Sequence, residues 1–303
     1  MKGLRVHVEG MGLTGSLLAW WLERWGCDWT WHDTEAPVTA WRASTGAIFP
    51  AGTRGSVDYE THAAWASWLT ARGAVYPRRF FEPATYWFNH KHPPHHGRYD
   101  CLAVGRHGLQ RAEPLSYHLN AQTFVKATRR QFAKQRLPGA AFSASVTVVA
   151  HGFGKRLHHV VWGWTVPVEL SYPTYMSGAR RPCLYLREGR FVMAYAYPMP
   201  GTDPRTWYAG SSLIHQREPR ELEVQPKFDR WRRLVKTLSR GAVKVLSYGG
   251  PRQGWRPAEA EPHCAPRVRR RGNVLEVPPL WHSGIRWFPA VLSMLENELR
   301  RKR

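Results

Sequence analysis

The chain has 303 residues, of which 43% are hydrophobic and 16 are tryptophan. This is enough for one large domain or two closely packed ones with a sizeable core. No apolar run reaches transmembrane length, no signal-peptide pattern precedes the first expected strand, and the four cysteines lack a C-x-x-C spacing. These features exclude a membrane span and a disulfide scaffold, so we expect a soluble cytoplasmic protein with reduced thiols.

Charge is the second informative feature of the composition. The chain has 44 Lys and Arg residues against 22 Asp and Glu residues, a net charge of +22. Such a field attracts polyanions, so we expect nucleic acid as a partner; a generally basic proteome or charge for solubility is the alternative. Basic residues also gather in short runs, the last of which can equally reflect the preference of a helix C-terminus for cations. The runs are Arg78–Arg79, Arg129–Arg130, Arg180–Arg181, Arg232–Arg233, Arg267 with Arg269–Arg271, and Arg300–Arg303.

The N-terminal segment predicts a β-α-β unit that binds a dinucleotide. A strand at Leu4–Glu9 leads directly into G-x-G-x-x-G, whose glycines are Gly10, Gly12 and Gly15. Gly10 permits a tight turn, Gly12 lets the backbone approach a pyrophosphate, and Gly15 lets helix and strand pack closely. An apolar helical pattern over residues 17–25 follows the motif. The fingerprint alone leaves NAD and FAD open.

The remainder of this unit supplies the other groups that a dinucleotide needs. The helix N-terminus, at Leu13 and Thr14, offers backbone N–H groups to phosphates. Gly26 ends the helix, a second strand follows at Trp29–Trp31, and Asp33 comes 23 positions after Gly10. We expect the Asp33 carboxylate to accept hydrogen bonds from the ribose hydroxyls.

The next hundred residues are less regular. A small-residue loop at Ala43–Gly46 precedes a helical pattern over residues 60–72, and residues 76–115 are rich in Pro, His and aromatic residues and read as irregular or β-like. The histidines of this stretch lie around Pro93–Pro94 without acidic or Cys partners, so we expect no metal site. They are His90, His92, His95 and His96.

The second half predicts an antiparallel sheet between helices. Residues 120–136 form an amphipathic pattern whose basic side is either a solvated face or a contact to backbone phosphates. A buried strand at Val146–Val149 ends in a turn at residues 150–152, and short β-like runs fill residues 159–215. Helices are expected at Glu221–Leu238 and from about Pro289, with a strand at Val274–Val277 between them.

Several separated segments, taken in order, resemble the D-amino-acid oxidase/glycine oxidase group of FAD-dependent oxidoreductases. Besides the fingerprint with Asp33, these are the loop Ala43-Ser44-Thr45-Gly46, the strand and turn Val148-Val149-Ala150-His151-Gly152, the motif Gly254-Trp255-Arg256-Pro257, and the closing segment Asn273–Pro289. The chain departs from the pattern in its shorter length and in Pro279-Leu280, where the family commonly has a glycine.

The resemblance implies an α/β (α+β) fold with FAD as the cofactor. A Rossmann-like FAD-binding domain is expected from residues 1–75, 116–158 and 249–303, and a mainly antiparallel substrate domain from residues 76–115 and 159–248. Besides the fingerprint residues and Asp33, the cofactor is expected to contact the residues that match the family's motifs. These are Ala43, Ser44, Thr45, Gly46, Ala150, Gly152, Gly284 and Ile285.

On the substrate side, the resemblance makes Arg256 the carboxylate-binding residue, which suits the planar fork of a guanidinium. It places His282 and Ser283 above the flavin, although His282 can equally cap the last helix. Arg286 is expected to contact a substrate acid, the flavin or a phosphate, with helix-start packing as the alternative. Tyr197 shares a strand face with Tyr195 and either lines a pocket or packs within the sheet.

The resemblance and the charge together predict an FAD-dependent amine oxidase acting on a glycine-like group carried by a nucleic-acid base, with oxygen as electron acceptor. The expected products are glyoxylate and an aminomethyl base. This is similar to flavin-dependent enzymes of phage thymidine hypermodification, which would place the protein in a host cytoplasm and favours DNA. Three alternatives stay open: oxidation of free glycine, sarcosine or another small amino acid; oxidation of carboxymethylaminomethyl-uridine in tRNA; and a non-catalytic, FAD-containing nucleic-acid-binding protein.

Overall fold

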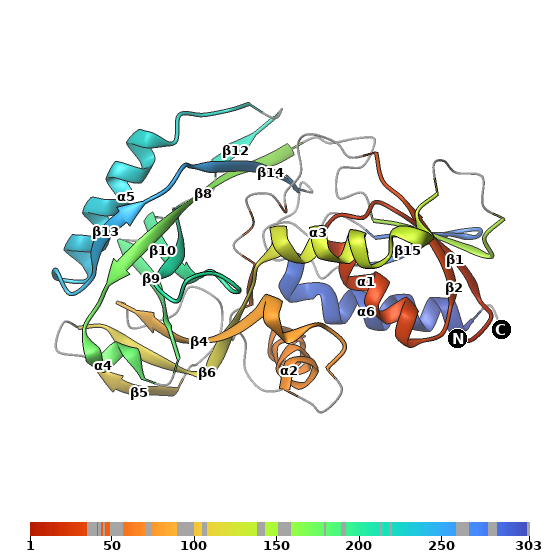
Figure 1. Ribbon diagram of the computed structural model, residues 1–303, viewed down its shortest axis with the longest axis horizontal. Coiled ribbons are helices and arrows are strands. Elements are labelled where there is room, and N and C mark those ends of the chain that lie inside the picture. Colours follow the sequence, from red (N-terminus) through yellow and green to blue (C-terminus); the bar gives the residue numbers. More distant parts are fainter. Residues whose placement is uncertain are drawn as a thin grey trace.

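A computed structural model shows a small parallel sheet with helices at one end of the molecule and a larger sheet at the other (Figure 1). The structure describes residues 1–34, 41, 44, 46–48, 57–70, 74–89, 100–104, 108–137, 143–150, 159–178, 180–188, 192–211, 214–217, 220–258, 267–277 and 284–301. Every structural statement below concerns these residues.

The small sheet has five strands in the order β15-β16-β7-β1-β2. Strands β2, β1, β7 and β16 are parallel neighbours, whereas β15 is an antiparallel edge. Val6 and Val8 of the central strand are fully buried on one face and His7 between them is 3% exposed on the other, as expected for a parallel sheet covered on both faces. The strands are β1 (Arg5–Glu9), β2 (Asp28–His32), β7 (Val146–Val149), β15 (Arg269–Arg271) and β16 (Val274–Glu276).

Four helices belong to this half of the molecule, and indole groups of α1 and β2 donate hydrogen bonds to α3 and to the residue that follows it. Helix α1 packs against α3 and α6, and α2 packs against α6. Trp20 Nε1 of α1 donates to Thr128 Oγ1 of α3 at 3.0 Å, and Trp31 Nε1 of β2 donates to the Phe132 carbonyl at 2.7 Å. The helices are α1 (Leu13–Arg24), α2 (Val57–Thr70), α3 (Ala121–Gln131, followed by the 3₁₀ turn η3, Ala133–Gln135) and α6 (Gly284–Arg300).

The last helix begins earlier than the sequence predicts. We expected it from about Pro289, but α6 begins at Gly284 and contains Pro289 in its second turn. A proline there has no N–H for the carbonyl four residues before it, which belongs to Ile285. Trp65 Nε1 of α2 donates to that carbonyl at 3.0 Å. The indole therefore satisfies the group that the proline leaves without a helical partner.

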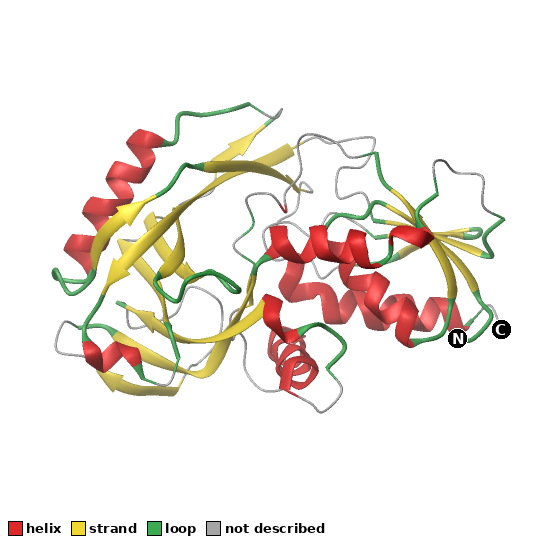
Figure 2. Ribbon diagram, viewed as in Figure 1, coloured by secondary structure: helices red, strands yellow, loops and turns green. Residues whose placement is uncertain are grey.

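The larger sheet has eleven strands and is antiparallel except where β4 pairs with β9 (Figure 2). Its path is β12-β8-β11-β10-β9-β4-β6-β3, with β13 and β14 beside β8 and β5 beside β6. The predicted fold class, a Rossmann-like unit with a second, mainly antiparallel sheet, is therefore confirmed. The strands are β3 (Ala47–Ile48), β4 (Phe81–Phe88), β5 (Asp100–Val104), β6 (Gln110–Leu119), β8 (His159–Ser171), β9 (Pro182–Glu188), β10 (Val192–Pro198), β11 (Thr206–Ser211), β12 (Ile214–Gln216), β13 (Lys244–Tyr248) and β14 (Arg252–Ala258).

The two faces of the larger sheet bury different side chains. One face packs Val and Trp residues, Trp164 and Val166 among them, against Phe228 and Trp231 of helix α5 (Gln225–Leu238). The other face buries a separate aromatic cluster that includes Tyr197. This is the alternation that strands impose on successive side chains. Two short helices complete the fold, η2 (Arg78–Phe80) and α4 (Thr174–Ser177).

Three segments that the sequence assigned to the FAD-binding domain lie in the larger sheet. Strand β14 falls in the range 249–303 yet pairs with β8 over seven residues, from Arg252↔Thr165 to Ala258↔His159. Residues 116–119 continue strand β6, and β3 pairs with them. These pairings join segments that are far apart in the sequence, which no local pattern reveals, and the domain boundaries themselves stay a prediction. No described helix is long and apolar enough to cross a bilayer.

Candidate cofactor and substrate site

The predicted cofactor residues of the parallel sheet follow the carboxyl ends of three adjacent strands. Backbone hydrogen bonds join these three ends to one another, from Gly10 N to His32 O at 2.8 Å and from Ala150 N to Glu9 O at 2.7 Å, and a third joins them to the end of β16, from Val277 N to Val149 O at 2.9 Å. Gly10, Asp33 and Ala150 therefore lie along one edge of the sheet. Ligands of open α/β sheets bind at this edge.

The glycine turn has the geometry that its sequence predicts. Gly10 has a φ of +95°, which favours glycine, and a Cβ on Gly15 would overlap the Gly10 carbonyl oxygen. The first hydrogen bond within α1 runs from Ser16 N to Gly12 O at 2.9 Å. The N–H groups of Leu13, Thr14 and Gly15 therefore have no carbonyl partner within the helix, and a helix terminus of this kind is suited to an anion.

Asp33 closes this edge through contacts with both the glycine turn and α3. Its Oδ2 accepts a hydrogen bond from Met11 N at 3.1 Å and forms an ion pair with the Arg129 guanidinium. Arg129 Nε also donates to the Met11 carbonyl at 3.0 Å, and the guanidinium lies over the Trp41 ring, 5.6 Å from its centroid. The side chains of Arg129 and Asp33 are 20% and 13% exposed, so this pair is partly shielded from water.

The structure divides the predicted basic face of α3. Lys126, Arg130 and Lys134 are exposed as expected, but Arg129 reaches inward to Asp33. The sequence therefore did not reveal the role of Arg129. The helical pattern contains the signal, because Arg129 follows the buried Val125 by four positions and lies beside the buried Thr128.

Trp41 completes the arrangement around the turn. It is 9% exposed, and its Cδ1 lies 3.6 Å from the position that a Gly12 Cβ would occupy. Asp33, Arg129, Trp41 and the α1 N-terminus thus surround the turn with one acceptor, one cation, one aromatic ring and a set of backbone donors. These groups fit the adenosine and pyrophosphate that FAD and NAD share.

The predicted small-residue loop has a packing role at its last residue. Gly46 has a φ of +58°, and a Cβ there would overlap the Leu119 carbonyl oxygen of β6. Leu119 N donates to Gly46 O at 3.0 Å, and Gly46 N donates to Ser44 Oγ at 3.1 Å. The close approach of β6 explains the glycine. Ala43 and Thr45 lie outside the described residues, and cofactor contact by this loop stays a prediction.

The predicted substrate residues are only partly within the described structure. Arg256 lies in β14 opposite Val161 of β8, and its side chain is outside the described part. Gly152, His282 and Ser283 are also outside it. Gly284 is the first residue of α6, and Ile285 is buried with its carbonyl bound by Trp65. These placements leave the substrate and flavin roles of all six residues as predictions.

Arg286 lies at the start of α6 with a buried histidine nearby, at the junction of α2 and β6. The guanidinium of the half-buried Arg286 lies 5.5 Å from the Trp287 ring centroid. His62 Nε2 of α2 lies 3.0 Å from the Leu115 carbonyl of β6. Burial lowers the pKa of His62 to about 4, the hydrogen bond to Leu115 acts in the opposite direction, and the positive charge of Arg286 lowers it further. His62 is thus a neutral donor at pH 7, a residue that the sequence did not single out.

Tyr197 lies in the aromatic cluster of the larger sheet. The rings of Tyr195 and Tyr197 stack with centroids 4.8 Å apart, and a Cβ on Gly210 would overlap the Tyr195 ring. The His118 ring stacks on the Tyr197 ring, with centroids 5.2 Å apart. Burial raises the pKa of Tyr197 well above its ordinary value, so its hydroxyl keeps its proton. The predicted shared face is confirmed, and a direct substrate role is not tested.

Ser116, His118 and Cys183 form a polar group within the same cluster. Ser116 Oγ lies 3.0 Å from His118 Nε2 and 3.2 Å from Cys183 Sγ, and it donates to the Ala84 carbonyl at 3.1 Å. Burial and the nearby charge of Arg181 lower the pKa of His118 to about 3. Burial raises the pKa of the Cys183 thiol to about 12. A neutral imidazole beside a neutral thiol does not provide an activated nucleophile.

The described part of the chain contains no recognisable metal-binding site. No group of three or more His, Cys, Asp or Glu side chains there is arranged to hold an ion. The histidines at positions 90, 92, 95 and 96 lie outside the described residues, so their predicted lack of a metal site stays untested.

The overall arrangement has counterparts among solved structures. Glycine oxidase from Bacillus cereus aligns with 99% of this chain and 96% of its own, at a TM-score of 0.67 and 14% identity. Iminodiacetate oxidase from Chelativorans sp. BNC1 aligns with 94% of this chain and 92% of its own, at a TM-score of 0.62 and 14% identity. The chain has the fold of FAD-dependent amino-acid and amine oxidases.

A more distant match adds a structure that contains the cofactor. The glycerol-3-phosphate dehydrogenase from Bacillus halodurans, complexed with FAD, aligns with 99% of this chain and 65% of its own, at a TM-score of 0.54 and 12% identity. At these identities the likeness concerns the fold. No protein-family profile and no curated protein matches the sequence.

Proposed function

We propose that the protein is an FAD-dependent oxidoreductase that oxidises the CH–NH bond of an amine bearing a carboxylate. The observation that carries this proposal is the sheet edge at which Gly10, Gly15 and Asp33 meet, in a chain with the fold of amine oxidases. The edge provides backbone donors for a pyrophosphate and a carboxylate for ribose hydroxyls.

The substrate class that the comparisons favour is a small amino acid such as glycine or sarcosine. Glycine oxidase and iminodiacetate oxidase share the fold, and both names denote small carboxylate-bearing amines. FAD held at this edge would supply a hydride acceptor for the carbon that bears the amine. The task of this chain is then to hold the substrate carboxylate and exclude competing charges. Molecular oxygen is the expected electron acceptor.

Arg256 is the proposed carboxylate clamp, because its guanidinium can donate two parallel hydrogen bonds. Arg286, which is half-buried at the start of α6, is the second candidate, because its guanidinium can donate the same pair of hydrogen bonds. Tyr197 and the neutral His118 would contribute an uncharged wall, with the Tyr197 hydroxyl protonated at pH 7. His282 and Ser283 precede α6 and are proposed to lie near the flavin ring.

The test is steady-state oxidase activity of the FAD-loaded protein on glycine, sarcosine and iminodiacetate, measured as hydrogen peroxide. Arg256→Lys keeps the charge but loses the planar fork, so we expect KM for the carboxylate substrates to rise more than tenfold while FAD content is unchanged. Arg252→Lys, in the same strand, is the matched control. Equal kinetics for all three proteins would contradict the role of Arg256.

A second candidate is favoured by the net charge of +22. In it, the same site oxidises a carboxymethylamino group on a nucleic-acid base, either in DNA, as in phage thymidine hypermodification, or in tRNA. Two-electron oxidation gives an imine, and its hydrolysis releases glyoxylate and leaves an aminomethyl base, while oxygen becomes hydrogen peroxide. Oligonucleotides carrying the glycine adduct, compared with free glycine, separate the two candidates by kcat/KM. Bound flavin that neither substrate class reduces would instead indicate a non-catalytic, FAD-containing nucleic-acid-binding protein.

A further inference from the structure

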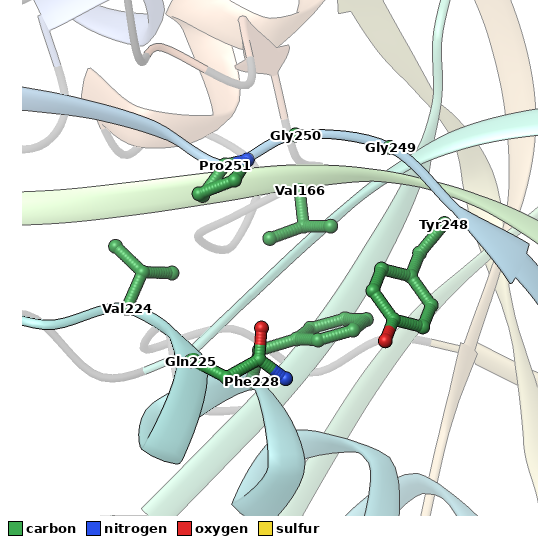
Figure 3. A pocket seen from close by; sticks show the side chains of 8 residues that line it. All are labelled: Val166, Val224, Gln225, Phe228, Tyr248, Gly249, Gly250 and Pro251. Atoms are coloured by element: carbon green, nitrogen blue, oxygen red, sulfur yellow. The ribbon is translucent and has the colours of Figure 1, made fainter.

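A cavity of about 290 Å³ opens between helix α5 and strand β13, on the outer side of the larger sheet (Figure 3). Its floor is apolar, formed by Val166 and Phe228, which are 2% and 1% exposed. Gln225 and Tyr248 stand at its rim, and Gly250 leaves open space where a side chain would be. The volume is at the small end of ligand pockets and suits one or two fused rings.

Strand β13 presents unusual apolar surface beside this cavity. Leu246 is 59% exposed and Tyr248 is 51% exposed, and they account for two of the three large exposed hydrophobic side chains in the described structure. The Tyr248 ring contacts Phe228 with centroids 4.9 Å apart, and the Arg232 guanidinium lies 5.6 Å from the Tyr248 centroid. One face of Tyr248 is thus fixed by α5 while half of the side chain remains open to solvent.

The chain around this cavity is strongly basic. Residues 225–244 contain seven basic residues and one acidic residue. The acid, Asp229, is 3.8 Å from Arg232, and two further acids, Glu221 and Glu223, precede α5 on the exposed side. Arg232, Arg233, Lys236 and Lys244 are all exposed. We call these four residues, with Leu246, Tyr248 and the cavity, the α5–β13 face.

The chemistry of this face fits one kind of partner. Exposed cations bind phosphates, and an exposed aromatic ring beside a pocket stacks on a base, which is the combination used for single strands. A duplex would keep its bases away from Tyr248. An acidic peptide would satisfy the charge but not the ring. Strand β13 pairs with β8 alone among the described strands, so its other edge could pair with a strand of a second copy of this chain. That copy would, however, bring the same positive charge against the α5–β13 face.

We infer that the α5–β13 face binds single-stranded nucleic acid, with a base against Tyr248 in the cavity and the flanking phosphates on Arg233 and Lys236. The face lies on the opposite side of the sheet from the Tyr197 cluster, and Figure 1 places α5 and β13 at the end of the molecule away from α1 and β1. The inference therefore goes beyond the proposed amine oxidation and stands without it.

The test is fluorescence anisotropy of a labelled oligothymidylate, about 15 nucleotides long, with the full chain over a series of salt concentrations. We expect the wild-type affinity to fall linearly on logarithmic axes as salt rises. Tyr248→Ala should weaken binding by roughly 5- to 100-fold, whereas Tyr248→Phe, which keeps the ring, should bind within about twofold of wild type. Thermal unfolding of each variant confirms that it is folded.

A charge variant and its control test the phosphate contacts. The double substitution Arg233→Gln with Lys236→Gln should reduce the salt slope by about 1.4, because each phosphate contact on a single strand contributes about 0.7. The control, Lys126→Gln with Arg130→Gln, removes two exposed charges from α3 and should leave the slope unchanged. Wild-type affinity in the α5 variant, loss of affinity in the α3 control, or binding of polyglutamate that Tyr248→Ala does not weaken would each overturn the inference.

Discussion

The two sheets organise their polar side chains in opposite ways. At the carboxyl edge of the small sheet, charged and backbone groups are gathered, with Asp33 and Arg129 paired beside the N–H groups of α1. On the Tyr197 side of the larger sheet, the buried polar groups are neutral, with His118 and Cys183 both held in their uncharged forms. The first arrangement is suited to phosphates and ribose, and the second to a region from which charge is excluded.

The largest effect should come from the glycine turn. Gly15→Ala puts a Cβ onto the Gly10 carbonyl oxygen, so we expect loss of FAD binding and a free energy of unfolding lower by about 3 kcal/mol. Gly12→Ala is the matched variant, since its Cβ would make an ordinary 3.6 Å contact with Trp41. It should fold normally and lose FAD affinity alone. Denaturant unfolding and flavin fluorescence measure the two effects, and normal FAD binding by both variants would contradict the assignment of this edge.

The neutral histidines should make stability depend on pH. Folding lowers the pKa of His62 to about 4 and of His118 to about 3, from an ordinary value of 6.5. The contribution of the two neutral histidines to the free energy of unfolding is therefore fully present above pH 6.5, and it is lost as the pH falls through 4 and towards 3. Each can contribute up to about 1.4 kcal/mol per pH unit within that window.

The comparison with His62→Gln, whose amide can still donate to the Leu115 carbonyl, isolates one of these contributions. We expect its melting temperature to fall less than that of wild type between pH 6.5 and 4. Parallel curves for the two proteins would show that His62 is not held neutral by the fold.

A smaller effect is expected for the Asp33–Arg129 pair. Arg129→Gln leaves Asp33 with Met11 N but without its cation, so we expect a loss of about 1 to 2 kcal/mol in stability, discounted for the partial exposure of the pair. FAD affinity should fall as well, because Asp33 is no longer fixed towards the ribose. Arg130→Gln, on the exposed side of α3, should change neither quantity. Titration of FAD and thermal unfolding provide the measurements, and identical behaviour of the two variants would remove Arg129 from the site.

The smallest effect should come from Cys183. Since burial holds its pKa at about 12, the thiol should resist alkylation in the folded protein at pH 8, whereas the half-buried Cys27 should react faster than Cys183. Cys183→Ala should change kcat by less than about twofold. Mass spectrometry after brief alkylation checks the reactivity, and rapid labelling of Cys183 would contradict a charge-excluding cluster.

The same contrast explains how far the sequence could predict the structure. Gly10, Gly15 and Asp33 lie within 24 residues of one another, so local pattern and turn chemistry predict their arrangement. Arg129 is 96 residues from Asp33, and the partner of the Ile285 carbonyl, Trp65, is 220 residues away. Contacts at such separations depend on tertiary packing. For this reason the start of α6 and the role of Arg129 were missed, and the pairing of β14 with β8 was not foreseen.

The most direct test of the central proposal is anaerobic mixing of the FAD-loaded protein with glycine, sarcosine or iminodiacetate while the flavin absorbance is followed. The proposed function predicts stoichiometric FAD and bleaching of its absorbance by at least one of these amines, with recovery when oxygen is admitted. Failure to bind FAD, or a bound flavin that neither these amines nor a glycine-adducted oligonucleotide reduces, would contradict it.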